Sequence, residues 1–258
     1  MKYAISLVLL AMLLGNANAA LKSEVVEYRH GDTVLEGYLA YDDAIPGKRP
    51  GILVVHEWWG QKSYERKRAD QLARLGFVAF ALDMYGKGKV TREVKEAMQW
   101  SGAFKDDRKF GRARADAGLE VLKRHPLVDG KRIAAIGYCF GGTVVLEMAR
   151  GGADLAGVAS FHGGLDTPAP AEAGKVKAKV LVLQGGDDPF VPQAQLNAFE
   201  EEMRKAGADW QVHVYGGAVH SFTNPESGGH GLKGVAYNER ADRRSWEEMK
   251  VFLAEIFR

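Results

Sequence analysis

The amino-acid sequence predicts an α/β fold with a mostly parallel central sheet, helices on both faces of that sheet and an N-terminal antiparallel hairpin. Short, continuously apolar segments alternate with segments of helical spacing along the chain. Continuous apolarity is typical of strands buried on both faces, and alternation of strands with helices favours right-handed crossovers between parallel strands. Because such sheets bind ligands beyond the carboxyl ends of their strands, we expect functional residues directly after strands.

The expected elements follow one another in a regular order. Partly alternating segments at 24–28 and 34–40 flank the turn residues His30-Gly31-Asp32-Thr33, which predicts the hairpin. We expect further strands at 51–55, 77–82, 133–136, 180–183 and 210–215. Helical spacing predicts helices at 64–75, 107–124, 143–150, 193–206 and 238–257. The glycine-rich segment 226–234 is expected to be a mobile loop.

The composition is that of an ordinary globular protein. The chain has 258 residues, of which 46% are hydrophobic and 26% are charged. No Pro- or Ser-rich linker divides the sequence, so we expect residues 20–258 to form one domain. The formal net charge is +2, and basic residues are interspersed with acidic ones, which argues against a nucleic-acid partner. We expect a monomer.

The first 19 residues have the pattern of a secretory signal peptide. Met1-Lys2 gives a basic start, residues 5–14 form a short apolar core, and Ala17-Asn18-Ala19 offers a small-residue cleavage site. The apolar core is too short to span a bilayer comfortably, so we expect no permanent membrane anchor and a periplasmic or secreted protein. The chain has a single Cys, which excludes an internal disulfide, and a lone Cys is often a small buried hydrophobic residue.

The segment around this Cys has the pattern of a nucleophile elbow. The apolar strand at 133–136 enters Gly137-Tyr138-Cys139-Phe140-Gly141-Gly142, and helical spacing resumes at residue 143. Glycines beside the nucleophile allow the close backbone contacts of this strained turn, which is typical of α/β-hydrolases. A helix that begins beside Cys139 also favours a thiolate. The alternatives are a glycine-rich connection with an inert Cys and a dinucleotide loop, but a dinucleotide fingerprint fits the glycine spacing poorly.

An acid and a base follow the nucleophile in the order that an α/β-hydrolase requires. The strand at 180–183 leads into Asp187 and Asp188, of which we favour Asp188, and the strand at 210–215 leads into His220. His220 would take the thiol proton, and Asp188 would fix the tautomer of His220. Alternatively, the carboxylates cap a turn and His220 is a surface residue. No His-x-x-x-His pair or Cys-rich cluster is present, so we expect no metal and no cofactor.

Three motifs together resemble the dienelactone hydrolase family. They are Gly137-Tyr138-Cys139-Phe140-Gly141-Gly142, Asp188-Pro189-Phe190-Val191-Pro192 and His220-Ser221-Phe222, and the likeness extends from residue 54 to the C-terminal helix. The resemblance implies a carboxylic ester hydrolase of the carboxymethylenebutenolidase type, which cleaves a small ester or lactone through a thioacyl-enzyme. It also implies that Glu57 lies near the resting Cys139 and keeps it a thiol, and that the N–H groups of Phe140 and Trp58 form an oxyanion hole.

One departure concerns the substrate. The resemblance implies that family members that act on dienelactone bind its carboxylate with pocket arginines, and the matching positions here are Lys87 and Asn224. Tyr85, with Trp58 and Trp59, would line a more apolar pocket. These changes leave open a noncatalytic protein that binds a small metabolite. A separate alternative is acyl transfer or peptide hydrolysis by the same Cys-His pair.

Overall fold

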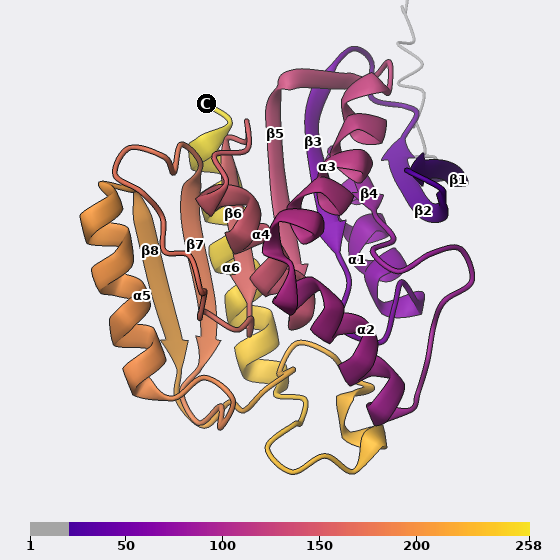
Figure 1. Cartoon of the computed structure of the whole chain (residues 1–258). Coiled ribbons are helices and arrows are strands. Elements are labelled where there is room, and N and C mark those ends of the chain that lie inside the picture. Colours follow the sequence, from indigo (N-terminus) through magenta and orange to yellow (C-terminus); the bar gives the residue numbers. More distant parts are fainter. Residues whose placement is uncertain (1–20) are drawn as a thin grey trace, which may run out of the picture.

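A mixed eight-stranded sheet forms the centre of the molecule (Figure 1). The computed structural model describes residues 21–258, apart from the side chain of His230, so the predicted signal peptide lies outside the described residues. The strands are β1 Leu21–His30, β2 Thr33–Asp42, β3 Arg49–Val55, β4 Val78–Ala81, β5 Val128–Tyr138, β6 Gly157–Phe161, β7 Lys179–Gly185 and β8 Trp210–Tyr215. They lie in the order β1-β2-β4-β3-β5-β6-β7-β8.

The sheet is parallel except at its N-terminal edge. β1 pairs antiparallel with β2 in an unbroken register from Leu21 opposite Asp42 to His30 opposite Thr33, and β2 pairs antiparallel with β4. All the pairs from β4 to β8 are parallel. The predicted fold class, a mostly parallel sheet with an N-terminal antiparallel hairpin, is confirmed. This topology is that of an α/β-hydrolase.

Helices cover both faces of the sheet. They are α1 Ser63–Arg74, α2 Val94–Asp106, α3 Arg108–Arg124, α4 Phe140–Arg150, α5 Gln193–Ala206 and α6 Glu239–Ile256. α1 and α6 bury residues such as Leu72 and Phe252 against one face, whereas α3, α4 and α5 bury Leu119, Val145 and Phe199 against the other. Burial of apolar side chains in two separate layers is the main force that holds such an architecture together.

The main differences between the structure and the sequence prediction are helices and strands that the prediction did not include. The sequence prediction missed α2 and β6, and β5 begins five residues before the apolar segment that predicted it. α5 and β8 have the predicted bounds. The expected loop at 226–234 contains a short 3₁₀ helix, Ser227–His230.

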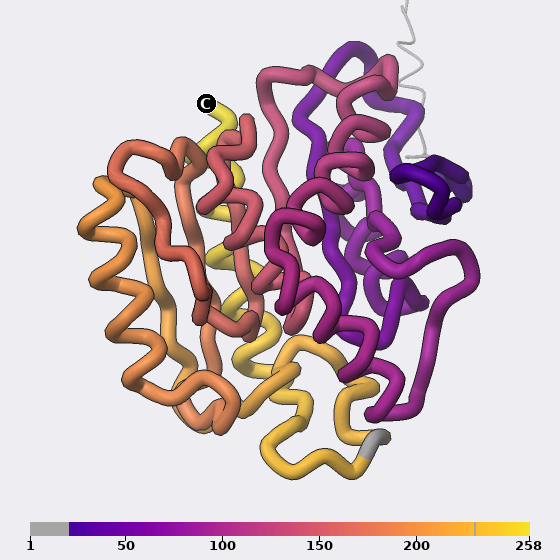
Figure 2. The backbone as a smooth tube through the Cα atoms, viewed as in Figure 1, coloured from indigo at the N-terminus to yellow at the C-terminus, as the bar shows by residue number. Residues whose placement is uncertain are grey.

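The carboxyl ends of the parallel strands lie together at the lower edge of the sheet in Figure 1. The segment between β8 and α6 folds across this edge, as the orange-to-yellow part of the tube shows (Figure 2). Within the part of the chain that the structure describes, no helix is both long and apolar enough to cross a membrane. The lower edge is therefore where loops from several strands can form a site.

Candidate active site

Cys139 lies in the sharp turn between β5 and α4. Its backbone has a φ of 53°, a strained value for a residue with a side chain. A Cβ atom at Gly137 would lie 2.0 Å from the carbonyl oxygen of Gly141, so only glycine permits this close approach of strand and helix. The Cys139 side chain is partly exposed. The local geometry is that of a nucleophile elbow, with the thiol at its tip.

The structure brings Cys139, His220 and Asp188 into one hydrogen-bonded chain. His220 Nε2 lies 3.1 Å from Cys139 Sγ, and His220 Nδ1 lies 2.8 Å from Asp188 Oδ2. The three residues follow β5, β8 and β7 respectively, so the parallel strands deliver them to the same edge. The Asp188 side chain is fully buried, whereas the His220 side chain is 13% exposed. The His-Asp contact is thus shielded from water while the Cys-His contact remains accessible.

Two further hydrogen bonds orient Asp188. Gln184 Nε2 donates to Asp188 Oδ2 at 2.9 Å, and the Phe190 N–H donates to Oδ1 at 2.9 Å. Asp187, the alternative carboxylate, is exposed. Burial opposes a charge on His220, but Cys139 and Asp188 together raise the pKa of His220 to about 10. The arrangement therefore favours the imidazolium form of His220.

The N–H groups of Trp58 and Phe140 are available for an oxyanion. Phe140 is the first residue of α4, where a backbone N–H has no partner within the helix. Trp58 lies in a turn that the Gly60 N–H closes on the Glu57 carbonyl oxygen at 3.3 Å. Within residues 21–258, neither the Trp58 nor the Phe140 N–H donates to a protein acceptor. Free backbone donors beside a nucleophile are the usual means of stabilising a tetrahedral intermediate.

Glu57 is buried between the loops that follow β3 and β8. Ser221 Oγ donates to its Oε1 at 3.0 Å, and Asn224 Nδ2 donates to its Oε2 at 2.7 Å. Burial raises the pKa of Glu57, and the hydrogen bonds from Asn224 and Ser221 oppose that rise. The hydrogen bonds of the described residues pair Cys139 Sγ with His220 and the Glu57 carboxylate with Ser221 and Asn224, and none joins Glu57 to Cys139.

Lys87 is the one predicted substrate residue that the structure directs away from the triad. Its ammonium lies 2.6 Å from Glu27 and 3.9 Å from Glu36. Glu27 belongs to β1, four strands from β5, which corresponds to roughly 19 Å at about 4.8 Å per strand. The Lys87 N–H donates to the Val34 carbonyl oxygen at 2.9 Å, so the turn after β4 is bound along β2. The Lys87 ammonium thus pairs with carboxylates of the N-terminal hairpin, and its contact with substrate stays a prediction.

Tyr85 and Asn224 support other groups of the site. The Tyr85 hydroxyl donates to the Trp58 carbonyl oxygen at 3.0 Å, and the Tyr85 ring lies 5.6 Å from the Phe140 ring, centroid to centroid. Tyr85 therefore holds both residues that carry the free N–H groups. Asn224 is engaged by Glu57, which leaves its side chain committed to a protein carboxylate.

Two residues beside the triad were given no role by sequence reasoning. Phe190 is 53% exposed, and its ring packs edge-on against His220 with the centroids 5.2 Å apart. His162 follows β6 and is fully buried, and its Nδ1 accepts a hydrogen bond from the Cys139 N–H at 3.1 Å. Because β6 itself was not recognised in the sequence, nothing indicated that His162 stands at the end of a strand. For Phe190, no residue pattern separates a functional loop aromatic from an ordinary one.

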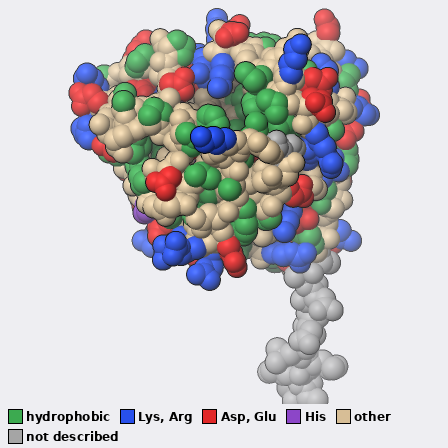
Figure 3. All heavy atoms as spheres, turned by 90° about the horizontal axis from the view of Figure 1, so that it is seen from below, with side chains coloured by type: hydrophobic (Ala, Val, Ile, Leu, Met, Phe, Trp, Pro, Cys, Tyr) green, Lys and Arg blue, Asp and Glu red, His purple; other side chains and the backbone are tan. Residues whose placement is uncertain are grey.

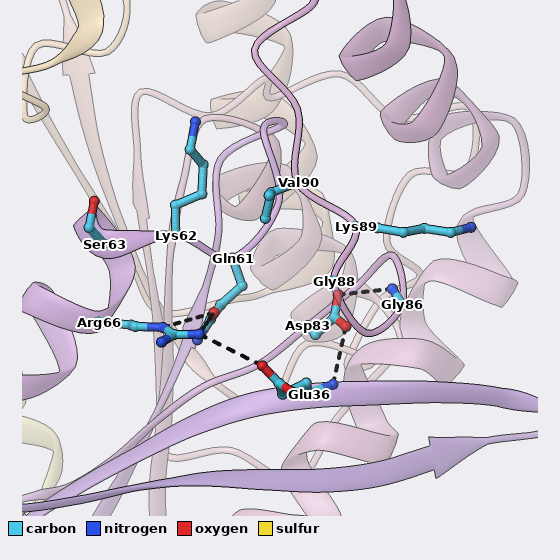
Figure 4. Close-up of a pocket in the computed structure, with 10 residues that line it drawn as sticks. All are labelled: Glu36, Gln61, Lys62, Ser63, Arg66, Asp83, Gly86, Gly88, Lys89 and Val90. Carbon is cyan, nitrogen blue, oxygen red and sulfur yellow. Dashed lines mark hydrogen bonds and ion pairs between the residues drawn. The ribbon is translucent and has the colours of Figure 1, made fainter.

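A cavity of about 360 Å³ lies between β2, the start of α1 and the loop after β4 (Figure 4). Arg66 donates to Gln61 Oε1 at 3.1 Å and lies 3.9 Å from Glu36, and Asp83 accepts the Glu36 N–H at 3.2 Å. Arg66, Gln61, Glu36 and Asp83 are thus joined by contacts within the cavity wall, and no residue of the triad lines the cavity. Among the described residues, no group of three or more His, Cys, Asp or Glu side chains could hold a metal ion.

The fold and the Cys-His-Asp arrangement define a protein of the α/β-hydrolase class. Comparison with known proteins gives the family: the dienelactone hydrolase family matches residues 35–257. The chain belongs to this family, and it is a dienelactone hydrolase-like hydrolase.

Similar proteins agree with this assignment. The crystal structure of a dienelactone hydrolase-like promiscuous phosphotriesterase from metagenomic libraries matches with a TM-score of 0.90 and 40% identity, over 93% of this chain and 100% of that one. An uncharacterized protein of Caenorhabditis elegans is 38% identical over 56% of this chain and 92% of its own length. A carboxymethylenebutenolidase of Pseudomonas putida is 29% identical over 76% of this chain and 85% of its own length.

Proposed function

We propose that this protein is an exported hydrolase that cleaves a small ester or lactone through a thioacyl-enzyme on Cys139. The observation that carries the proposal is the continuous hydrogen-bonded chain from Asp188 through His220 to Cys139 Sγ. The chain's family and its similarity to a carboxymethylenebutenolidase support the reaction type.

In the proposed mechanism the Cys139 thiolate attacks the carbonyl carbon of the ester. The new C–S bond forms as the carbonyl electrons move to oxygen, and the N–H groups of Trp58 and Phe140 bind the resulting oxyanion. Collapse of this intermediate breaks the C–O bond, and the His220 imidazolium gives its proton to the departing alkoxide. His220 then takes a proton from water, the hydroxide attacks the thioester, and the thiolate leaves. With a lactone, the alkoxide stays tethered to the acyl group.

Glu57 fits the role of a group that restrains the thiolate. A carboxylate buried near the reacting pair favours an imidazolium at His220 but disfavours a thiolate at Cys139. Ser221 and Asn224 lie on the loop that carries His220 and donate hydrogen bonds to Glu57, so the charge state of Glu57 is coupled to the position of the base.

The substrate that this site favours is apolar and uncharged. Lys87 pairs with Glu27, and Asn224 is bound to Glu57, so neither side chain is free to bind a carboxylate. The exposed ring of Phe190 stands beside His220, where it can contact an acyl or alcohol group. Figure 3 views the edge with the carboxyl ends of the strands, and hydrophobic side chains spread over the middle of this face.

The test is turnover by the purified protein and by Cys139→Ala. Activated esters and thioesters should show burst release of the alcohol or thiol, and lactones should show ring opening. The neutral form of each substrate should be preferred to its carboxylate-bearing form. Cys139→Ala should lose turnover on every substrate, because no other thiol is present in the chain. Turnover by Cys139→Ala at the wild-type rate would overturn the mechanism. A small molecule that raises the midpoint of thermal unfolding and is recovered intact would favour the noncatalytic alternative.

A second candidate activity is the hydrolysis of phosphotriesters. The similar protein of 40% identity is a dienelactone hydrolase-like promiscuous phosphotriesterase. The same thiolate would attack phosphorus and expel an aryloxide, which His220 would protonate. Water, deprotonated by His220, would then break the P–S bond and release the thiolate. Release of nitrophenol from a neutral aryl phosphotriester by the wild type, and its absence in Cys139→Ala, would support this activity.

Export can be tested separately. The basic start, apolar core and small-residue exit of residues 1–19 predict cleavage after Ala19. Expression of the full chain in a Gram-negative host should give a periplasmic protein whose mass corresponds to a start at Ala20. A full-length protein recovered from the cytosol would contradict export, but it would not contradict the proposed reaction at Cys139.

A further inference from the structure

His162 joins the nucleophile to the loop that carries the base. The Cys139 N–H is shared between the Phe161 carbonyl oxygen at 3.0 Å and His162 Nδ1 at 3.1 Å. Because Nδ1 accepts, the imidazole proton must lie on Nε2, which contacts Thr223 Oγ1 at 2.7 Å. Thr223 is three residues after His220. One imidazole therefore spans from the elbow backbone to the base loop.

The backbone of His162 is strained where it makes this contact. Its φ is 41°, in the left-handed region that side chains disfavour. The residues with positive φ other than glycine in residues 21–258 are Cys139, His162 and Ser221, and all three belong to the site or its immediate support. Strain of this kind persists only where the surroundings enforce it, and it concentrates at functional sites.

The contacts from Cys139 through His162 to Thr223 form a bridge, and its Thr223 end is hydrogen-bonded to α1. Thr223 Oγ1 lies 2.7 Å from the Tyr64 hydroxyl, to which Arg68 Nε donates at 3.2 Å. Arg68 also donates to the Thr223 carbonyl oxygen at 2.9 Å and pairs with Asp242 at 2.5 Å. Tyr64, Arg68 and Thr223 are buried, so their hydrogen bonds lie in a low-dielectric interior.

A neutral imidazole suits this position. The ring of His162 lies 5.4 Å from that of His220, centroid to centroid, so a second positive charge here would repel the catalytic imidazolium. Burial, together with the charges of His220 and Arg68, keeps the pKa of His162 well below its usual range. His162 thus stays an acceptor toward Cys139 while His220 cycles through its charged form.

We infer that His162 is a positioning residue, which uses Thr223 to hold the backbone of Cys139 and the loop of His220 in register. The inference rests on the proposed function, since the register matters only if Cys139 and His220 react as a pair. Neither residue would touch substrate. Loosening the bridge would lengthen the contact of 3.1 Å between Sγ and Nε2, and small errors in the alignment of reacting groups reduce kcat strongly.

The experiment compares His162→Asn, Thr223→Val and Thr223→Ser with the wild type. Asn tolerates a positive φ and its amide oxygen can accept from the Cys139 N–H, but it is too short to reach Thr223. Thr223→Val removes the hydroxyl at nearly constant shape, and Thr223→Ser retains it. We expect kcat on a neutral activated ester to fall about 10- to 100-fold in the first two variants, with KM changed less than about threefold. Thr223→Ser should be close to the wild type.

Alkylation gives a readout that needs no substrate. The chain has one Cys, so the rate of reaction with iodoacetamide reports on Cys139 alone. In His162→Asn and Thr223→Val, we expect the midpoint of the rate against pH to move upward by about one unit, because a displaced imidazolium stabilises the thiolate less. In Thr223→Ser, the midpoint should stay in place.

The outcomes separate positioning from mere support of the fold. Wild-type kcat and an unshifted alkylation midpoint in Thr223→Val would overturn the inference, even if its thermal unfolding midpoint falls. Losses in Thr223→Ser as large as those in Thr223→Val would also overturn it. If the wild type hydrolyses no ester at all, the proposed function fails, whereas the shift in alkylation still decides whether His162 holds the pair.

Discussion

At the residue scale, Asp188 and Asp187 are neighbours in sequence with opposite environments. Asp188 is buried and accepts hydrogen bonds from His220, Gln184 and Phe190, whereas Asp187 is exposed. Asp188→Asn should lower kcat by about 10³- to 10⁴-fold, because an amide has one acceptor oxygen and can stabilise the wrong tautomer of His220. Steady-state kinetics on one ester would measure the loss. Asp187→Asn is the matched control, and an equal loss in both variants would contradict the assignment.

The site residues that could be predicted from the sequence are those whose position is set by the end of a strand. Cys139, Asp188 and His220 each follow a recognisable strand, and parallel strands bring their carboxyl ends to one edge. Lys87 also follows a strand, but a turn with a positive φ at Gly86 directs it toward the N-terminal hairpin. Loop conformation of this kind is set by contacts distant in sequence, so no local pattern reveals it.

At the scale of elements, the predictable segments are those with strong periodicity. The helix from 193 to 206 and the strand from 210 to 215 have the expected bounds. β6 was missed because it is five residues long and is made mostly of small side chains, and α2 because it buries only Ala97, Ser101 and Phe104. The site residue that was missed, His162, lies directly after the missed strand.

The packing of α4 on β3 gives a prediction at this scale. A Cβ atom at Gly141 would lie 2.2 Å from the Val55 carbonyl oxygen and 2.8 Å from that of His56. Because these neighbours are backbone atoms, Gly141→Ala must push α4 away from the strand that leads to Trp58. We expect the free energy of unfolding in urea to fall by about 3 kcal/mol, and kcat to fall as the two oxyanion donors separate.

A glycine in β5 is the control for this substitution. A Cβ atom at Gly130 would meet no atom within 4 Å, and its φ is not positive. Gly130→Ala should therefore change the free energy of unfolding by less than about 0.5 kcal/mol. A Gly141→Ala protein as stable as Gly130→Ala would show that strand and helix can separate without cost.

At the scale of the whole molecule, the sheet arranges the site in spatial order. Neighbouring strands β3, β5, β6, β7 and β8 are followed in turn by Glu57, Cys139, His162, Asp188 and His220. Two layers of helices pack on the sheet, and the loops that carry these five residues lie at the lower edge in Figure 1. Two carboxyl groups are buried near this edge: Glu65 belongs to the first turn of α1, and its Oε1 accepts a hydrogen bond from the Glu57 N–H at 3.1 Å.

Glu65 makes the stability of the protein depend on pH. Burial and the nearby charge of Glu57 raise the pKa of Glu65 from its usual 4.5 to about 8. Between these values the folded state holds a proton that the unfolded chain has released, so the stabilisation is complete below pH about 4.5 and is lost as the pH rises through about 8. We expect this group to lower the free energy of unfolding by about 3 kcal/mol between pH 5 and pH 8.

Urea denaturation of Glu65→Gln should give a flatter dependence of the free energy of unfolding on pH over this range, and the exposed Glu172→Gln should keep the wild-type slope. A Glu65→Gln protein with the wild-type slope would mean that Glu65 is already ionised in the folded state at pH 5.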